Sequence, residues 1–439
     1  MPQKGFVCSR RRFLKTVAGA GLAGATPWFI PAHALGKSGA IAPSERITLG
    51  GIGIRHRGEY VLRYMLDQPD VQFLAVCDVR ADRRQAVKTL VDAKYGNHDC
   101  DTYRDFRELL ERPDIDAVLI ATGDRWHAIA SIYAAKAGKD IYCEKPCAMT
   151  IELAGALDDA IRRYGRVFQA GTQRRNIANF VHAVHLARSG KLGKLHTLHA
   201  SIYVLQERHD WLPAEPEPPK DELDWDLWLG PAPWRPYNRQ YVDGGWRGHF
   251  DFDSGARLLD WGAHTVDLCQ WANQADDTTL IEFEPAGENR IVGRYANGVK
   301  LILRNTGWLG LGTCPVRFEG DEGWIETGDS GRIVVEPPSL QLAQIRPLDS
   351  GSADEVERVW GPGISPRCHV RDFLDCVKSR ALPASNARAT RKTHVACHAA
   401  YIAWLLKRKV SFDPLKEEFI GDDEANLMRS RALREPWHI

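Results

Sequence analysis

The sequence lacks three features that would each define a class of protein: paired cysteine motifs, an excess of charge and a long apolar run. Its ten cysteines include no Cys-x-x-Cys pair, and the nine beyond residue 34 are an odd number. This pattern predicts neither a disulfide framework nor a zinc site, and we predict no metal. The formal net charge is +1, so electrostatics favour neither nucleic acid nor an anionic membrane as a partner.

The longest apolar stretch near the N-terminus, residues 16–30, is too short and glycine-rich for stable membrane insertion. It follows Ser9-Arg10-Arg11-Arg12-Phe13-Leu14-Lys15 and precedes Ala32-His33-Ala34, a small-x-small cleavage site. Twin arginines in this order indicate a Tat signal peptide over residues 1–34, with a disordered basic tail as the alternative. We therefore expect a soluble periplasmic protein, which would carry any dinucleotide already bound when exported.

Residues 45–170 alternate strand and helix, which predicts an open parallel sheet of the Rossmann type. The first strand, 46–53, ends in Gly51-x-Gly53 and precedes a helix from Gly58. A tight glycine turn before a helix N-terminus is where such folds bind a pyrophosphate. The pattern is imperfect, because His56 stands in the expected place of the third glycine.

Asp78 follows the second strand, 71–77, and lies 25 positions after Gly53. A carboxylate there can hold the adenosine ribose hydroxyls, which favours NAD over NADP. Arg80, Arg83 and Arg84 follow closely and leave NADP open. A capping role for Asp78 at the strand end is the structural alternative.

Residues 116–150 organise the rest of the chain. A buried strand, 117–121, leads to Thr122, and an alanine-rich helix, 127–137, begins at His127. The next strand, 140–143, ends in Glu144-Lys145-Pro146. Ligands bind outside the carboxyl ends of parallel strands, so Lys145 is predicted to point into a cleft.

Residues 171–411 predict a second domain, and residues 412–439 a polar C-terminal arm. A tryptophan-rich region, 206–253, suits the faces and hydroxyls of sugars, or packs an irregular excursion against the sheet. Strand patterns over 279–335 predict a large, mostly antiparallel sheet with one face free for a subunit partner. We expect helices over 101–111, 180–189, 369–379 and 392–406, and a loop over 340–365.

The stretch 254–273 carries a second candidate site. Asp260 and His264 are spaced i, i+4 and so project from one helix face. A neutral imidazole positioned by a carboxylate can accept a hydroxyl proton while hydride leaves the same carbon. A solvated helix pair is the alternative; a metal pair lacks further ligands.

Taken together, these motifs resemble those of the Gfo/Idh/MocA oxidoreductases. They are Gly51-x-Gly53, the Asp78 strand end, Val118–Thr122 with Trp126-His127, Ala137-Gly-Lys139, Glu144-Lys145-Pro146 and Asp260-Trp-Gly-Ala-His264. The resemblance extends from about residue 45 to the C-terminus. It implies a Rossmann domain followed by an α/β domain whose sheet forms homodimers or homotetramers.

The resemblance also implies hydride transfer between a nicotinamide cofactor and a sugar or cyclitol. Lys145 would orient the substrate hydroxyl, His264 would be the acid/base, and Asp260 would hold substrate or imidazole. Cofactor-binding residues would be Gly51, Gly53, Asp78, Thr122, His127, Glu144 and Lys145. The alternatives are NAD-dependent glycoside cleavage through transient oxidation at C3, and a sugar-binding protein without catalysis.

Overall fold

The structure is a computed structural model that describes residues 41–305, 307–340 and 354–439. The predicted signal peptide, 1–34, lies outside these residues. Within them, no helix is long and apolar enough to cross a lipid bilayer.

The first sheet is fully parallel, with strand order β3-β2-β1-β4-β5-β6. This is the order of a doubly wound dinucleotide fold, and it reverses between β1 and β4. Every residue of β4 and β5 is buried, as expected for strands covered on both faces. The strands are β1 Ile47–Ile52, β2 Val71–Cys77, β3 Asp101–Tyr103, β4 Ala117–Ile120, β5 Asp140–Cys143 and β6 Phe168–Ala170.

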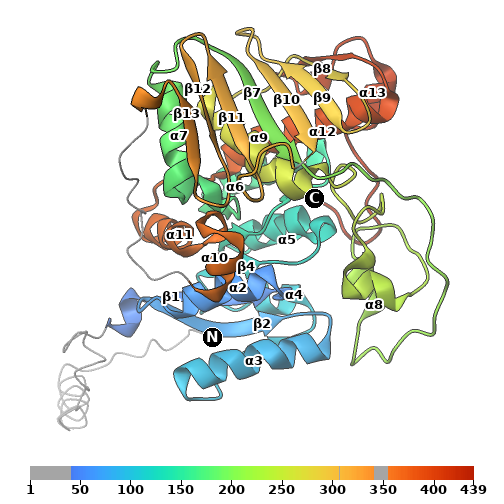
Figure 1. Cartoon of the computed structure of the whole chain (residues 1–439). Coiled ribbons are helices and arrows are strands. Elements are labelled where there is room, and N and C mark those ends of the chain that lie inside the picture. The colour runs from blue at the N-terminus through green and yellow to red at the C-terminus, as the bar shows by residue number, and fades with distance from the viewer. Residues whose placement is uncertain (1–40, 306, 341–353) are drawn as a thin grey trace, which may run out of the picture. The chain divides into compact units, whose positions relative to one another are not determined.

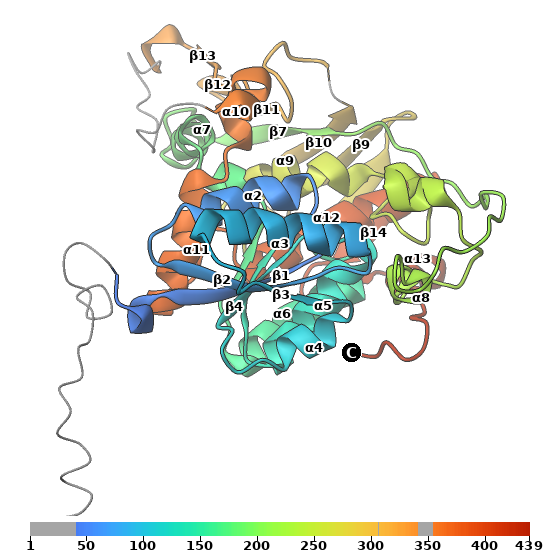
Figure 2. The same cartoon turned by 90° about the horizontal axis from the view of Figure 1, so that it is seen from below.

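Helices cover both faces of this sheet, and each face has its own apolar core. Figure 2 shows α2 (Arg57–Leu66) and α3 (Ala81–Tyr95) on one face, and α4 (Phe106–Leu110), α5 (Asp124–Lys136) and α6 (Ile151–Tyr164) on the other. The helix predicted over 101–111 is wrong. Its first residues instead pair with β2 as β3, and Asp105 then caps α4 by accepting the N–H of Arg107.

The second sheet has nine strands in the order β13-β12-β11-β7-β10-β9-β8-β14-β15. Only the β7–β10 pair is parallel, so the prediction of a mostly antiparallel sheet is confirmed. Figure 1 shows this sheet above the Rossmann domain. Its strands are β7 Leu195–Ile202, β8 Glu282–Pro285, β9 Arg290–Arg294, β10 Lys300–Asn305, β11 Val316–Gly320, β12 Gly323–Thr327, β13 Ile333–Glu336, β14 Val410–Asp413 and β15 Glu418–Phe419.

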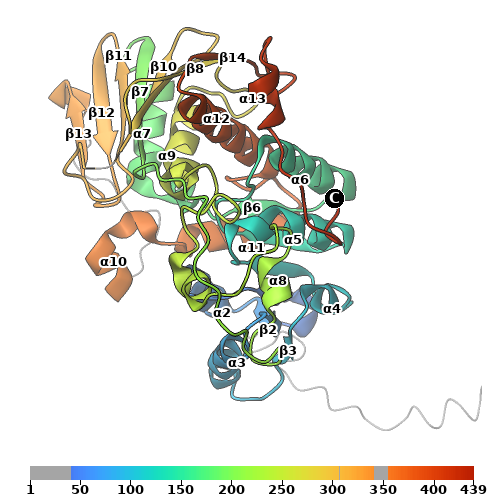
Figure 3. The ribbon, with the colours of Figure 1, turned by 90° about the vertical axis from the view of Figure 1, so that its right-hand side faces the viewer.

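Three helices pack against one face of the large sheet: α7 (Ala178–Arg188), α9 (Leu258–Ala272) and α12 (Ala387–Leu406). Figure 3 shows α9 and α12 beneath the strands. The inward residues of β10 and β11 are buried and their neighbours are half-buried or exposed. This alternation matches a sheet with one covered face. The helix α11 (Arg367–Ser379) packs instead on α2 of the Rossmann domain.

The predicted loop and the predicted polar arm both contain helix. The predicted loop 340–365 contains α10 (Glu355–Trp360), which Asp354 caps by accepting the N–H of Glu357. The predicted C-terminal arm contributes β15 and α13 (Asp423–Leu427). Trp437 near its end is 2% exposed and packs against Trp126, with ring centroids 4.6 Å apart. The arm therefore closes part of the Rossmann core.

The tryptophan-rich region mostly packs on itself. Trp225, Trp228 and Trp246 are buried in a cluster with Tyr237, Tyr241 and Phe252. Its one α-helix, α8 (Trp225–Leu229), lies beside the Rossmann domain in Figures 1 and 3. Trp211 and Trp234 remain exposed, at 55% and 57%. The packing alternative therefore accounts for the three buried tryptophans.

Candidate active site

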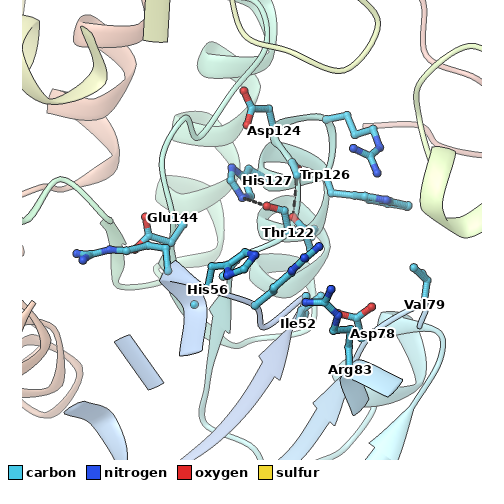
Figure 4. Close-up of a pocket in the computed structure, with 18 of the residues that line it drawn as sticks. Ile52, His56, Asp78, Val79, Arg83, Thr122, Asp124, Trp126, His127 and Glu144 are labelled. Atoms are coloured by element: carbon cyan, nitrogen blue, oxygen red, sulfur yellow. Dashed lines mark hydrogen bonds and ion pairs between the residues drawn. The ribbon is translucent and has the colours of Figure 1, made fainter. Parts of the chain in front are cut away.

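A cleft of about 640 Å³ lies at the carboxyl ends of β1, β2, β4 and β5. Figure 4 shows its Rossmann wall, with Asp78 and Arg83 at one end and Asp124 at the other. The second domain closes it with Arg174, Trp228, Val242, Trp246 and His264. The opening at the topological switch point between β1 and β4 is the position where such sheets bind ligands.

The glycine turn differs in register from the sequence prediction. Gly53, not Gly51, makes the tight turn: its φ is +70°, and an added Cβ would lie 2.4 Å from Thr122 Cγ2. Gly58 permits close packing of α2, since its Cβ would lie 2.6 Å from that of Ala121. Gly51 lies inside β1 against Phe73 and does not line the cleft. Spacing alone could have shown this, because residues 53, 55 and 58 have the G-x-G-x-x-G intervals.

Asp78 lies at the end of β2 and lines the cleft beside Arg80 and Arg83. Its carboxylate accepts the backbone N–H of Arg80 at 2.9 Å. Burial raises the pKa of Asp78 to about 6, although the neighbouring arginines oppose that shift. The carboxylate keeps free acceptor capacity for a hydroxyl donor.

Thr122 and His127 join the ends of β4 and β5. His127 Nδ1 lies 2.6 Å from the carbonyl oxygen of Pro146, and Nε2 lies 3.1 Å from that of Thr122. Burial lowers the pKa of His127 to about 4, so its ring is neutral and donates to one of these carbonyls. His127 thus lies between the two strand ends and is hydrogen-bonded to one of them, while both it and Thr122 line the cleft.

Glu144 and Lys145 follow β5 and also line the cleft. The carboxylate of Glu144 lies 3.4 Å from Arg57 Nε. The ammonium of Lys145 reaches across to the second domain, where its Nζ donates to the carbonyl oxygen of Asp260 at 2.5 Å. Residues 145 and 260, which lie 115 positions apart in the sequence, are therefore in contact through the backbone of Asp260.

On α9, His264 lines the cleft and its Nδ1 has no hydrogen-bond partner among the described residues. Burial, then the charges of Arg174, Lys145 and Arg57, hold the pKa of His264 well below its usual value. The carboxylate of Asp260 pairs with Arg257 at 3.4 Å and Arg247 at 3.6 Å. The predicted orientation of this imidazole by Asp260 is therefore absent, because these arginines engage the carboxylate.

Sequence reasoning missed two buried aspartates near this point. Asp124 accepts the N–H of Ser254 at 3.1 Å, and Asp253 accepts that of Arg257 at 2.6 Å. Burial, and then the charge of Asp260, raise the pKa of Asp124 to about 6. Burial, then Asp124 and Asp260, raise the pKa of Asp253 to about 8. Only tertiary contact brings these carboxylates together, so no local pattern could have identified them.

The donors of the cleft fit a dinucleotide. Four of its arginines carry a buried N–H without a partner among the described residues: Arg55, Arg57, Arg125 and Arg174. Buried donors in native proteins are normally satisfied, and phosphate oxygens are strong acceptors for guanidinium groups. The parallel sheet, the glycine turn and this cleft together define a dinucleotide-binding protein with a second α/β domain.

Comparison with known families makes this class more specific. Residues 46–172 match the oxidoreductase family described as NAD-binding Rossmann fold, Gfo/Idh/MocA. Residues 205–309 and 355–439 match the C-terminal α/β domain of the same oxidoreductases. The chain belongs to the Gfo/Idh/MocA oxidoreductase family, as its motifs had indicated.

Individual relatives carry two kinds of name. A glycosyl hydrolase family 109 protein of Saccharopolyspora erythraea is 33% identical over 174 residues, 36% of this chain and 38% of that protein. Inositol 2-dehydrogenase of Salmonella paratyphi B is 32% identical over 136 residues, 30% of this chain and 38% of that one. The matched part thus spans less than two fifths of either relative.

Among solved structures, myo-inositol 2-dehydrogenase from Lactobacillus plantarum superposes with a TM-score of 0.60 at 15% identity. That match covers 84% of this chain and 100% of the other. At this identity the likeness concerns the fold alone.

Proposed function

We propose that this protein is an NAD-dependent oxidoreductase that transfers hydride between a tightly held nicotinamide cofactor and a hydroxyl or ketone of a sugar or cyclitol. The observation that carries the proposal is the meeting of Lys145 and α9. Lys145 Nζ bonds to the backbone of Asp260, and both Lys145 and His264 line the cleft that contains the glycine turn. A cation and a neutral imidazole from two domains thus face one cavity.

A bound nicotinamide dinucleotide would supply hydride transfer, and this chain's residues would orient the substrate and move its proton. Lys145 donates to the substrate oxygen and stabilises negative charge that develops there. His264, kept neutral by burial and neighbouring cations, accepts the hydroxyl proton. Asp260, with its arginine partners, holds the loop around Arg247 and Arg257 beside the substrate.

Asp78 supports NAD rather than NADP. Its carboxylate, at the end of β2, would accept hydrogen bonds from the ribose hydroxyls and repel a 2′-phosphate. Gly53, which packs against Thr122, forms the tight turn that would hold the pyrophosphate. His127 and Glu144 line the same cleft and complete the predicted cofactor-binding residues, from which we withdraw Gly51.

Two further expectations belong to this proposal. Export by the Tat signal at residues 1–34 to the periplasm would require the cofactor to travel bound. The face of the large sheet away from α7, α9 and α12 would form a homodimer or homotetramer. Fractionation of cells that express the full chain, and light scattering of the purified protein, test these expectations.

Direct detection of cofactor and substrate tests the main proposal. Mass spectrometry of small molecules released on denaturation should detect NAD. A panel of sugars and cyclitols should then contain a compound that changes the near-ultraviolet absorbance of the bound nicotinamide. Protein that carries no nicotinamide nucleotide and binds none when it is added would refute the proposal.

A second candidate function is supported by the glycosyl hydrolase family 109 name of a relative. In this reaction the same residues would serve oxidation at C3, elimination of the leaving group and re-reduction. An aryl glycoside distinguishes the two candidates. Release of its phenol with no net change in nicotinamide absorbance supports glycoside cleavage, whereas net reduction without phenol supports the dehydrogenase.

A further inference from the structure

An arginine stands where dinucleotide folds place their second glycine. With Gly53 in the tight turn and Gly58 at the close helix packing, the middle position of the pattern is Arg55. The glycine usually found there lets the pyrophosphate approach bare backbone. In this chain the same position instead presents a guanidinium group to the cleft.

The guanidinium of Arg55 has no carboxylate partner among the described residues. Its Nε is buried without a hydrogen bond, and its Nη1 makes one long contact, 3.4 Å to the carbonyl oxygen of Val242. Burial, then the charges of Arg80 and Arg55, lower the pKa of Arg83, another cleft residue. Arg80 and Arg83 at this end of the cleft each pair with an aspartate, whereas Arg55 does not.

Arg125 also has a buried N–H donor without a hydrogen-bond partner among the described residues, and its side chain lies deeper. It is 5% exposed, and its guanidinium stacks on Trp228, 3.7 Å from the ring centroid. Its Nε donates to the carbonyl oxygen of Trp228 at 2.7 Å, but its Nη1 has no partner. Burial lowers the pKa of Arg125 to about 9. The charge of the neighbouring Asp124 opposes this shift, but no carboxylate forms an ion pair with Arg125 among the described residues. An anionic ligand at this cleft would therefore stabilise both arginines.

Residues 219–247, which we call the roof segment, lie over the same cleft. The segment is tied to the end of β2 by backbone bonds: Ala81 N–H to Glu222 O at 2.9 Å and Asp224 N–H to Val79 O at 3.1 Å. Arg80 pairs with Asp243 at 3.2 Å. Figures 1 and 3 both show α8 of this segment beside the Rossmann strands. The roof segment therefore spans the adenosine side of the cleft.

We propose that Arg55 binds the diphosphate of the dinucleotide and that the roof segment covers the bound nucleotide, so that the chain retains it as a prosthetic group. This inference rests on the proposed function for the identity of the ligand. Two charge-assisted donors on one guanidinium can engage diphosphate oxygens together, which no backbone contact at a glycine can do. Opening the roof segment would require breaking its backbone bonds to Val79 and Ala81, just after β2.

The test measures nucleotide retention and needs no substrate. Full-length wild type is compared with Arg55→Gly, which restores the glycine pattern, and with Arg55→Lys, which keeps the charge. Arg332→Gly is the matched control, because Arg332 is exposed and does not line the cleft. Nucleotide per chain is counted after purification, and its dissociation is followed against excess free NAD.

Dissociation from Arg55→Gly should be about 10- to 100-fold faster than from wild type, the range that a hydrogen bond to a charged group supplies. Arg55→Lys should be intermediate and Arg332→Gly unchanged. Inorganic pyrophosphate should compete with NAD for binding to nucleotide-free wild type. It should not compete for binding to Arg55→Gly. If Arg55→Gly does not fold, the inference is tested by the dissociation rate of Arg55→Lys and by the competition of pyrophosphate with NAD for wild type.

Retention by Arg55→Gly equal to that of wild type would overturn the inference, as would rapid exchange of nucleotide by wild type itself. Failure of the proposed function gives a different pattern. Wild type would then hold its nucleotide in an Arg55-dependent manner, yet no sugar or cyclitol would change its redox state and no aryl glycoside would be cleaved.

Discussion

Replacing Lys145 by alanine tests the reaction at its centre. Among the described residues its ammonium makes one hydrogen bond, 2.5 Å from Nζ to the carbonyl oxygen of Asp260, and the side chain lines the cleft with His264. The substitution removes the cation that we propose faces the substrate oxygen, together with one bond between the two domains. It leaves Gly53, Asp78 and the cleft arginines in place, so the nucleotide should remain bound.

The expected loss follows from the role of the ammonium. Removing one preorganised donor to a developing negative charge lowers turnover about 100- to 1,000-fold, or about 2.7–4 kcal/mol of transition-state stabilisation. The lost bond to Asp260 should lower the free energy of unfolding by only about 1 kcal/mol. Activity and stability should therefore respond very differently to the same change.

Single-turnover reduction of the bound nicotinamide by a substrate from the sugar panel measures the effect directly. Nucleotide content and the unfolding midpoint are recorded on the same samples. Lys136→Ala, an exposed position on α5, is the control and should behave as wild type. Wild-type turnover by Lys145→Ala with its nucleotide bound would refute the role that we assign to Lys145.

Three other predictions concern buried groups. His394 Nε2 accepts the N–H of Cys147 at 2.8 Å, and burial lowers the pKa of His394 to about 4. As the pH falls below about 6.5, the His394 imidazole is therefore protonated in the unfolded state before it is protonated in the folded state. Between about pH 6.5 and 4, the free energy of unfolding of wild type, measured in urea, should therefore fall by up to about 1.4 kcal/mol per pH unit more than that of His394→Gln. An equal dependence on pH in the two proteins would contradict this. Arg175→Met leaves the buried carboxylate of Asp267 without its two bonds of 2.7 and 2.8 Å, and should lower the free energy of unfolding by about 3–5 kcal/mol, part of which a second change, Asp267→Leu, restores. Asp78→Ser should weaken NAD binding about tenfold and improve NADP relative to NAD in calorimetry, and unchanged selectivity would exclude Asp78 from the ribose site.

Much of the fold could be predicted because its signals are local. The apolar, β-branched run of β4 and the alanine-rich α5 each follow from a few neighbouring residues. The errors also have local causes. The stretch 101–111 has helical composition, but edge pairing with β2 draws its first three residues into β3. A stretch of three residues is too short for periodicity to identify it as a strand.

In the candidate site, too, the positions set by local sequence could be predicted and the contacts between distant segments could not. The sequence by itself determined that Lys145 lies at a strand end and that His264 is one helical turn from Asp260, because strand order and helical pitch set these positions. Only the tertiary structure decided that Arg247 and Arg257 engage Asp260, that Asp124 and Asp253 are buried near it, and that residues 219–247 cover the cleft. These contacts join segments far apart in the chain, and their free energies depend on burial and on the charge of whatever packs alongside, which no local pattern encodes.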